Sequence, residues 1–168
     1  MELKWFVAYV RSCQERTVAR QLSTLGIEHY FPVRKELRQW SDRKVLKERL
    51  LMPGLIFVHC TEQTRYSLAS KVAYLKYFMM DRMSKEPVSV PDRQLLNFRR
   101  FIDSSDMAVE MRSTDEFEAG DRVRVISGPL TDTECYVTSI KSKTYLYVSL
   151  GLLGSATAEI GVNQIEKI

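Results

Sequence analysis

The stretch Leu51-Met52-Pro53-Gly54-Leu55-Ile56-Phe57-Val58 decides how the first half of this chain folds. Proline fixes φ at about −65° and glycine accepts positive φ, so Pro53-Gly54 suits the two central positions of a tight turn. The apolar run of residues 55–58 is too short for a helix and apolar on both faces, which is typical of a strand in the middle of a covered sheet. Most such strands only build a core, although this one could also support a ligand or partner site.

A second strand and a helix are predicted upstream of this stretch. Trp5-Phe6-Val7-Ala8-Tyr9-Val10 is also apolar on both faces and predicts another central strand. Ser12-Cys13-Gln14-Glu15 has the form of a capping box, in which the Ser12 hydroxyl and the Glu15 carboxylate satisfy N–H groups of the first helical turn. Apolar residues at helical spacing follow, and Gly26 suits the position just after a helix. Arg16 and Arg20, four residues apart, form a cationic stripe on another face.

The most basic segment of the chain lies between these elements. Residues 27–33 predict a further strand, ended by Pro32. Residues 34–49 then carry seven Lys or Arg against three acids, and Trp40-Ser41-Asp42-Arg43 is typical of the tip of a long hairpin. A basic hairpin with an aromatic tip is suited to nucleic acid, but solvated hairpins also have this composition. The residues alone leave both interpretations open.

After the central strand, the pattern predicts two helices separated by extended chain. Thr61 is suited to be the N-cap of a short helix, and residues 72–80 favour a strand. Pro91 falls in the first turn of a helix whose Leu95, Phe98 and Ile102 share one face. The order β-α-β-β-β-α-β-α predicts an α+β N-terminal domain over residues 1–103, an antiparallel sheet flanked by helices.

The residue composition and the hydrophobic pattern change after this domain. Residues 104–117 are polar and acidic without periodicity, which predicts a linker. From residue 118 to 168, five short stretches alternate polar and apolar residues or favour strands, and turn residues separate them. This spacing predicts a small all-β, five-stranded barrel.

Composition limits the classes of function. The 168 residues are 45% hydrophobic and 27% charged, and no apolar run approaches the roughly 20 residues that cross a membrane. Without a signal peptide pattern, we expect a cytoplasmic protein. The three cysteines are far apart and fit neither a disulfide framework nor a zinc site. His29 and His59 have no nucleophile or ligand pattern beside them, and no phosphate-binding loop occurs. We therefore expect no catalytic residue, metal or cofactor.

The net charge of +4 conceals an asymmetry. Residues 1–103 contain 19 Lys or Arg and 11 Asp or Glu, a net charge of +8, whereas residues 104–168 contain 6 and 10, a net charge of −4. A basic half joined to an acidic half indicates that the first faces a polyanion and the second another partner, or that the two solvated surfaces simply differ.

Two motifs together resemble a known family. Ala119-Gly120-Asp121-Arg122-Val123-Arg124-Val125, followed by Gly128-Pro129-Leu130, resembles a KOW domain. The strand beginning at Trp5, the helix near Cys13, Pro32 and Pro53-Gly54-Leu55-Ile56-Phe57-Val58 resemble the NusG N-terminal domain. The pair covers nearly the whole chain in the family's order. The hairpin over residues 38–44 is more similar to specialised paralogues that control long surface-polysaccharide operons than to the housekeeping factor.

This resemblance implies a transcription elongation and antitermination factor that suppresses pausing or termination, and not an enzyme. It implies an apolar patch for the clamp helices of the RNA polymerase β′ subunit, with Tyr9, Leu55 and Phe57 in contact and Trp5 in support. We expect a charge at Phe57 to remove polymerase binding and leave the fold intact. The resemblance also implies a contact with the β gate loop, to which we assign no residue.

Nucleic-acid and further partners also follow from the resemblance. Arg11 and Arg16 match basic positions that meet non-template DNA, and Lys71 is a further candidate. The candidate nucleic-acid residues are Arg11, Arg16, Arg20, Arg38, Trp40, Arg43, Lys44 and Lys71. The barrel is expected to recruit a small-subunit ribosomal protein or a termination factor, and the chain to be a monomer. The alternative is a KOW-containing RNA- or ribosome-binding module that never binds polymerase.

One specialised family member folds the segment equivalent to residues 118–168 as an α-helical hairpin that masks the polymerase site. Here Gly151, Gly154 and Gly161 fall inside that stretch, and each lowers helix stability by about 0.8–1.0 kcal/mol relative to alanine. Tyr145-Leu146-Tyr147-Val148 favours strands. We therefore expect a β-barrel.

Overall fold

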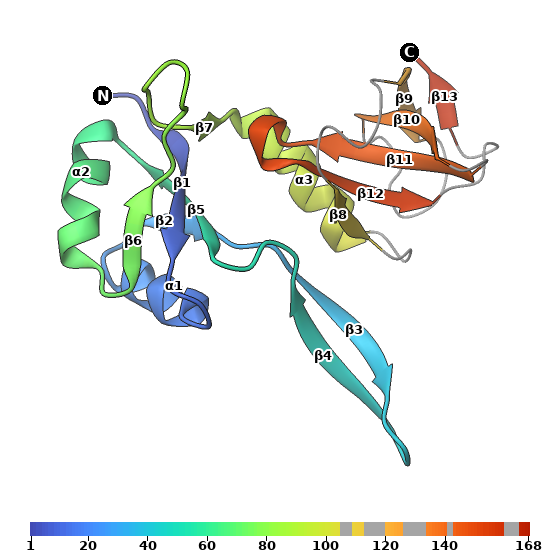
Figure 1. The fold of residues 1–168 in the computed structure, drawn as a ribbon, viewed down its shortest axis with the longest axis horizontal. Helices are drawn as coiled ribbons and strands as arrows, with labels where there is room; N and C mark the ends of the chain where they lie inside the picture. The colour runs from blue at the N-terminus through green and yellow to red at the C-terminus, as the bar shows by residue number, and fades with distance from the viewer. Residues whose placement is uncertain (105–108, 113–119, 126–133, 141–142, 160–164) are drawn as a thin grey trace. The chain divides into compact units, whose positions relative to one another are not determined.

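The computed structural model describes residues 1–104, 109–112, 120–125, 134–140, 143–159 and 165–168 (Figure 1). The chain folds into two compact units, residues 1–92 and 93–168. This division falls at the start of α3 (Asp92–Ser104), while the expected end of the first domain at residue 103 stays a prediction. No helix in the described ranges is both long and apolar enough to cross a membrane.

The first unit is built on an antiparallel sheet. β1 (Lys4–Val10) and β5 (Leu55–Cys60) lie at its centre, flanked by β2 (Glu28–Tyr30) and β6 (Leu75–Phe78), while β7 (Ser89–Val90) also pairs with β1. The two stretches predicted from their apolar character to be central strands are confirmed. Their register sets Tyr9 opposite Leu55 and Val7 opposite Phe57.

Two helices bury one face of this sheet. α1 (Glu15–Thr24) and α2 (Glu62–Lys71) contribute Val18, Leu22 and Leu68 to a core that includes Phe6, Ile56 and other residues at even positions of β1 and β5. Because strand side chains alternate between faces, the odd positions point to the opposite face. The expected α+β arrangement of helices on an antiparallel sheet is confirmed.

The sequence signals for the ends of α1 and α2 are confirmed at Gly26 and Thr61 but not at Ser12. Gly26 has φ +70° and ends α1 in a Schellman motif, with Ile27 N–H donating to the Leu22 carbonyl and Gly26 N–H to the Ser23 carbonyl. Thr61 caps α2 by accepting from Thr64 N–H at 3.2 Å. The predicted capping box at Ser12 and Glu15 is wrong, because Gln14 is the N-cap and makes no side-chain cap bond.

The Glu15 carboxylate instead holds the turn before the central strand. Glu15 is buried, and its Oε1 accepts from Gly54 N–H at 2.9 Å. The turn is closed by Leu55 N–H donating to the Met52 carbonyl, with Gly54 at φ +80°, as a glycine at the third turn position allows. Val10 N–H donates to the Gly54 carbonyl at 2.8 Å. The predicted Pro53-Gly54 turn is therefore confirmed and is tied to both β1 and α1.

The basic segment forms a separate two-stranded sheet. β3 (Val33–Gln39) pairs with β4 (Lys44–Leu50) and projects as a long hairpin, drawn in light blue and teal in Figure 1. Trp40 N–H donates to the Arg43 carbonyl at 2.8 Å, which confirms the predicted tip. The strand predicted over residues 27–33 and ended by the proline is confirmed as the shorter β2, and β3 begins after Pro32. Proline has no N–H to donate to a ladder.

The second unit carries α3 and a six-stranded antiparallel sheet. Its strands, in the spatial order β13-β9-β10-β11-β12-β8, are β8 (Glu110–Arg112), β9 (Arg122–Val125), β10 (Glu134–Ile140), β11 (Lys143–Ser149), β12 (Ser155–Glu159) and β13 (Ile165–Lys167). The five strands predicted within residues 118–168 are confirmed, and the helical-hairpin alternative is excluded for the described part of that segment. The predicted linker contains a strand, because β8 pairs with β12. Gly161 and the KOW turn at residues 128–130 lie outside the described residues.

Candidate functional site

The four residues expected to contact or support a polymerase helix pair lie on one face of the central sheet. Trp5, Tyr9, Leu55 and Phe57 all occupy odd positions of β1 and β5, opposite the face that α1 and α2 cover. We call this set the docking face. The register alone brings together residues separated by about fifty positions in the chain.

The members of the docking face differ in exposure. Phe57 is 0% exposed and Trp5 is also buried, whereas Tyr9 and Leu55 are half-buried. The Phe57 ring stacks against Tyr30, and Trp5 stacks against His59 with ring centroids 4.7 Å apart. A charge at Phe57 has to be desolvated inside the protein, so the expectation that such a variant keeps its fold is wrong.

An exposed tyrosine extends this face beyond the residues found from sequence. Tyr77 on β6 is 58% exposed and packs against Tyr9, with ring centroids 4.8 Å apart. β6 does not alternate, since Leu75 and Phe78 are buried while the two residues between them are exposed. The pairing of β1 with β6 also shifts register between Tyr9 and Val10. No period-2 signal in the sequence could therefore assign Tyr77 to a face.

The four cations expected near α1 and α2 are all exposed but have different partners. The Arg16 guanidinium forms an ion pair with the Glu48 carboxylate. The hydrogen bond that Arg16 donates within this ion pair, together with the Arg16 charge, holds the pKa of the Glu48 carboxyl below its usual value. Arg11 lies over the ring of Tyr74, 5.8 Å from its centroid. Arg16 is thus engaged by the hairpin, whereas Arg11, Arg20 and Lys71 pair with no carboxylate in the described residues.

The residues of the hairpin that were expected to bind nucleic acid lie on both of its faces and at its tip. Arg38 lies opposite Val45, on the face that also carries Arg34, Arg49 and Lys47, whereas Lys44 lies opposite Gln39 on the other face. That second face carries Leu37 and Leu46, directly opposite each other and 70% and 59% exposed. Trp40 and Arg43 are exposed at the tip. The exposed leucine pair was not anticipated from the sequence.

The cysteine and histidine side chains of the first unit have identifiable surroundings. In the part of the chain that the structure describes, no group of three or more His, Cys, Asp or Glu side chains is arranged to hold a metal. Burial raises the pKa of the Cys60 thiol to about 11, which keeps it protonated near neutral pH. His59 Nδ1 lies 2.8 Å from a Glu28 carboxylate oxygen, and His29 Nδ1 lies 3.0 Å from the Ile27 carbonyl oxygen.

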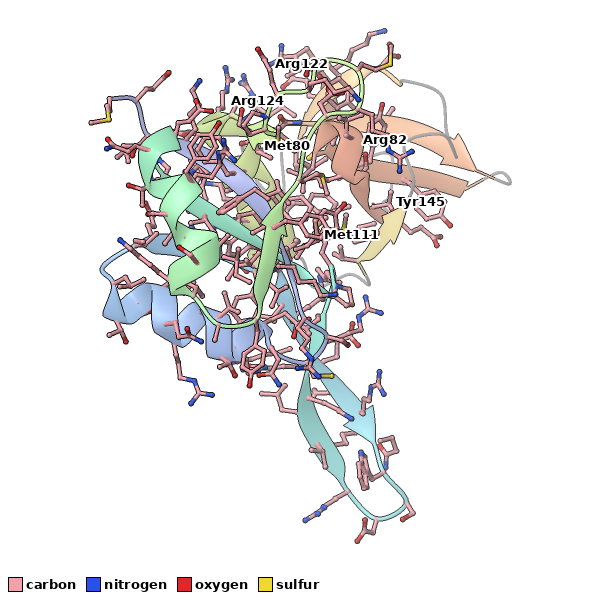
Figure 2. The ribbon with its side chains drawn as sticks, turned by 60° about the vertical axis from the view of Figure 1, so that its left-hand side comes forward. Met80, Arg82, Met111, Arg122, Arg124 and Tyr145 are labelled. Atoms are coloured by element: carbon pink, nitrogen blue, oxygen red, sulfur yellow. The ribbon has the colours of Figure 1, made fainter. Side chains whose placement is uncertain are left out.

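The second unit exposes polar side chains on β9. Figure 2 shows Arg122 and Arg124 on this strand; both are exposed, while Val123 and Val125 between them are buried. The predicted alternation of residues 122–125 is confirmed. Tyr136 on β10 lies opposite Arg122, is exposed, and stacks on Tyr147 with ring centroids 5.3 Å apart.

Comparison with known families assigns the first unit. Residues 3–99 match the family model for NusG, described as transcription termination factor nusG. The chain belongs to the NusG family. The resemblance inferred from the Trp5 strand and the Pro53-Gly54 turn is thereby confirmed.

Relatives of this NusG-family chain match it over its whole length. The transcription termination/antitermination protein NusG of Pseudomonas aeruginosa is 26% identical over 181 residues, covering 100% of both chains. That of Neisseria meningitidis serogroup B is 27% identical over 183 residues, covering 100% of this chain and 99% of its own. A solved structure concerned with domain interaction in Thermotoga maritima NusG covers 100% of this chain and 98% of its own, at 22% identity and a TM-score of 0.49. The chain is a NusG-family transcription termination/antitermination factor.

Proposed function

We propose that this factor binds RNA polymerase by seating the β′ clamp helices on the docking face, and suppresses pausing or termination. The observation that carries the proposal is the arrangement of Tyr9 and Leu55 at the surface, next to the exposed Tyr77 and above the buried Phe57. Helices that dock in apolar grooves depend on a few aromatic or aliphatic anchors backed by a packed core. The β gate loop meets another edge of the same unit.

The charge distribution supports a second contact, with non-template DNA in the elongation complex. Arg11, Arg20 and Lys71 are exposed cations on the first unit, whose sequence carries most of the positive charge. The hairpin adds Arg38, Arg43 and Lys44 together with an exposed Trp40. A tryptophan beside cations offers both stacking and phosphate contacts. The long basic hairpin supports a specialised role on particular long operons, such as those for surface polysaccharides.

The second unit supports a recruiting role. Arg122, Arg124 and Tyr136 form an exposed surface suited to a small-subunit ribosomal protein or a termination factor. We place the factor in the cytoplasm as a monomer that joins these partners through its two units.

Binding to purified polymerase core tests the main proposal. Leu55→Asp places a charge at a half-buried position of the docking face and is expected to weaken binding by about tenfold or more, as loss of an interface anchor does. Leu37→Asp is the matched control, because Leu37 is an exposed leucine of the same unit on the hairpin. Circular dichroism must show both variants folded. Equal affinities of a folded Leu55→Asp variant and the wild type contradict the docking face. If the wild type binds ribosomal components but no polymerase, the RNA- or ribosome-binding alternative holds.

A further inference from the structure

We propose that Tyr74 stacks on one unpaired nucleobase, so that the corner formed by Arg11 and Tyr74 binds single-stranded nucleic acid by a base as well as by phosphates. Tyr74 lies in the short connection between α2 and β6 and was not among the residues found from sequence. This inference rests on the proposed DNA contact of the first unit and names the group that this surface recognises.

The backbone of Tyr74 is held in an unfavourable conformation. Its φ is +69°, in the left-handed region, where a bulky side chain is an outlier. Residues persist in such conformations only when the surrounding structure fixes them, and they cluster at functional sites. A glycine or asparagine would occupy this position without the same conflict, yet the chain has a tyrosine here.

Three hydrogen bonds fix this connection to α1 and β1. The side-chain amide of Gln21 brackets Ala73, with Ala73 N–H donating to Oε1 at 2.9 Å and Nε2 donating to the Ala73 carbonyl at 3.4 Å. Arg11 N–H donates to the Tyr74 carbonyl at 2.9 Å. These bonds join segments more than fifty residues apart. The aromatic ring is therefore presented by a braced backbone and not by a free loop tip.

The ring itself is available and lies beside cations. The Tyr74 side chain is 43% exposed, and the Arg11 guanidinium lies 5.8 Å from the ring centroid, a cation–π distance. Lys71 stands three residues earlier, in the last turn of α2. Neither cation pairs with a carboxylate within the described residues. An aromatic face with the Arg11 guanidinium beside it suits a base and a neighbouring phosphate, because bases stack on aromatic rings while a cation neutralises the backbone.

Tyr66 shows what an exposed tyrosine without this arrangement looks like. It too has an arginine over its ring, since Arg65 lies 4.3 Å from the centroid. However, Tyr66 lies inside α2 with regular helical backbone, and Arg65 is buried and pairs with Glu62 at 3.2 Å. The cation beside the Tyr66 ring is thus buried and already engaged by a carboxylate. Tyr66 is therefore the matched control.

The experiment uses the full chain and short single-stranded DNA containing 2-aminopurine, whose fluorescence is quenched by stacking, at low salt. We expect wild-type protein and Tyr74→Phe to quench it equally. Tyr74→Leu should lose the quenching and bind between about fivefold and 150-fold more weakly, as expected for one lost stacked base. Tyr66→Leu should behave like the wild type. Unchanged quenching and affinity in Tyr74→Leu overturn the proposal, as does an absence of quenching by the wild type.

Two further measurements separate the proposal from its alternatives. Tyr74→Gly relieves the left-handed backbone, so its thermal midpoint should rise while DNA binding falls; a fall in both assigns Tyr74 a structural role and overturns the proposal. Polymerase core binding by Tyr74→Leu should equal that of the wild type. A chain that quenches 2-aminopurine through Tyr74 but does not bind polymerase removes the proposed docking function and leaves the stacking site standing. Polymerase binding without quenching does the reverse.

Discussion

The central strands β1 and β5 and the hairpin strands β3 and β4 are antiparallel pairs of similar length in very different surroundings. Most side chains of β1 and β5 are buried, on both faces of the sheet. The hairpin buries none of its side chains fully, and it exposes most of those on the face of Leu37 and Leu46. Side chains of the central pair are therefore committed to the stability of the first unit, whereas those of the hairpin can be changed without loss of core. Binding can therefore be tested by substitution at exposed hairpin positions and at the half-buried Tyr9 and Leu55, whereas substitution at the buried positions of the central pair measures folding.

The largest contrast is expected at Phe57. Phe57→Ala removes a fully buried ring from the central sheet and should lower the free energy of unfolding of the first unit by about 3–5 kcal/mol, the usual range for Phe→Ala in a core. Leu37→Ala on the exposed hairpin face should change it by less than about 0.5 kcal/mol. Denaturant unfolding followed by tryptophan fluorescence measures both. Similar losses at the two positions would falsify the distinction between the pairs.

The same contrast explains which parts of the fold the sequence could predict. β1 and β5 were predictable because both faces are apolar and a Pro-Gly turn precedes β5. The ends of α1 and α2 at Gly26 and Thr61 were predictable because those residues act locally. The role of Glu15 was not, since its partner is the Gly54 N–H, 39 residues away. A local capping pattern and a long-range bond compete for the same carboxylate, and only packing decides between them.

The residues of the candidate site likewise divide into those that the sequence could predict and those that it could not. Its exposed cations and the hairpin tip follow from composition and turn chemistry, which are visible along the chain. Tyr77 and Tyr74 are brought to the site by a register shift and by bonds from Gln21 and Arg11, which no short window contains. The apolar character of residues 55–58 on both faces did indicate a buried Phe57, whereas the family resemblance indicated a contact there, because a family contact position and a core position can have the same residue type.

Glu15 gives the second largest expected effect. Glu15→Ala leaves the half-buried Gly54 N–H without its partner at the turn that starts the central strand, and we expect a loss near the lower end of the about 1–3 kcal/mol that an unsatisfied buried donor costs. Glu2→Ala is the control, because Glu2 is exposed and its ion pair with Lys4, at 3.5 Å, lies at the surface. Urea unfolding curves of the two variants should differ in midpoint but not in slope. If Glu15→Ala is as stable as Glu2→Ala, the carboxylate does not hold the turn.

The hairpin should show almost no effect on stability and a clear effect on binding. Arg38→Ala with Arg43→Ala removes two exposed cations and should leave the unfolding free energy within about 0.5 kcal/mol. If both contact phosphates of a single strand, the slope of log affinity against log salt should become less negative by about 1.4, or about 0.7 for each. Lys76→Ala with Arg82→Ala changes the net charge equally at other positions of the unit (Figure 2 labels Arg82). An equal change of slope in that control assigns the effect to net charge and not to the hairpin.

The smallest effect is expected where the two regions meet, at the ion pair between Arg16 of α1 and Glu48 of β4. Arg16 holds the pKa of Glu48 below its ordinary value of 4.5. A carboxylate with a lowered folded pKa stabilises the fold above its unfolded pKa, and this contribution is lost as the pH falls through the folded pKa. The wild type should therefore be slightly more stable than Glu48→Gln at pH 7, and the two should converge in acid well below pH 4.5.

Because Glu48→Gln also releases the Arg16 guanidinium, it should bind single-stranded DNA somewhat more tightly, by less than the loss seen in the double arginine variant. Thermal midpoints between about pH 3 and pH 7 and a DNA titration at neutral pH measure the two changes on one protein. A pH-independent difference in midpoint would show that the ion pair is not its source, and unchanged DNA affinity would remove Arg16 from the nucleic-acid surface.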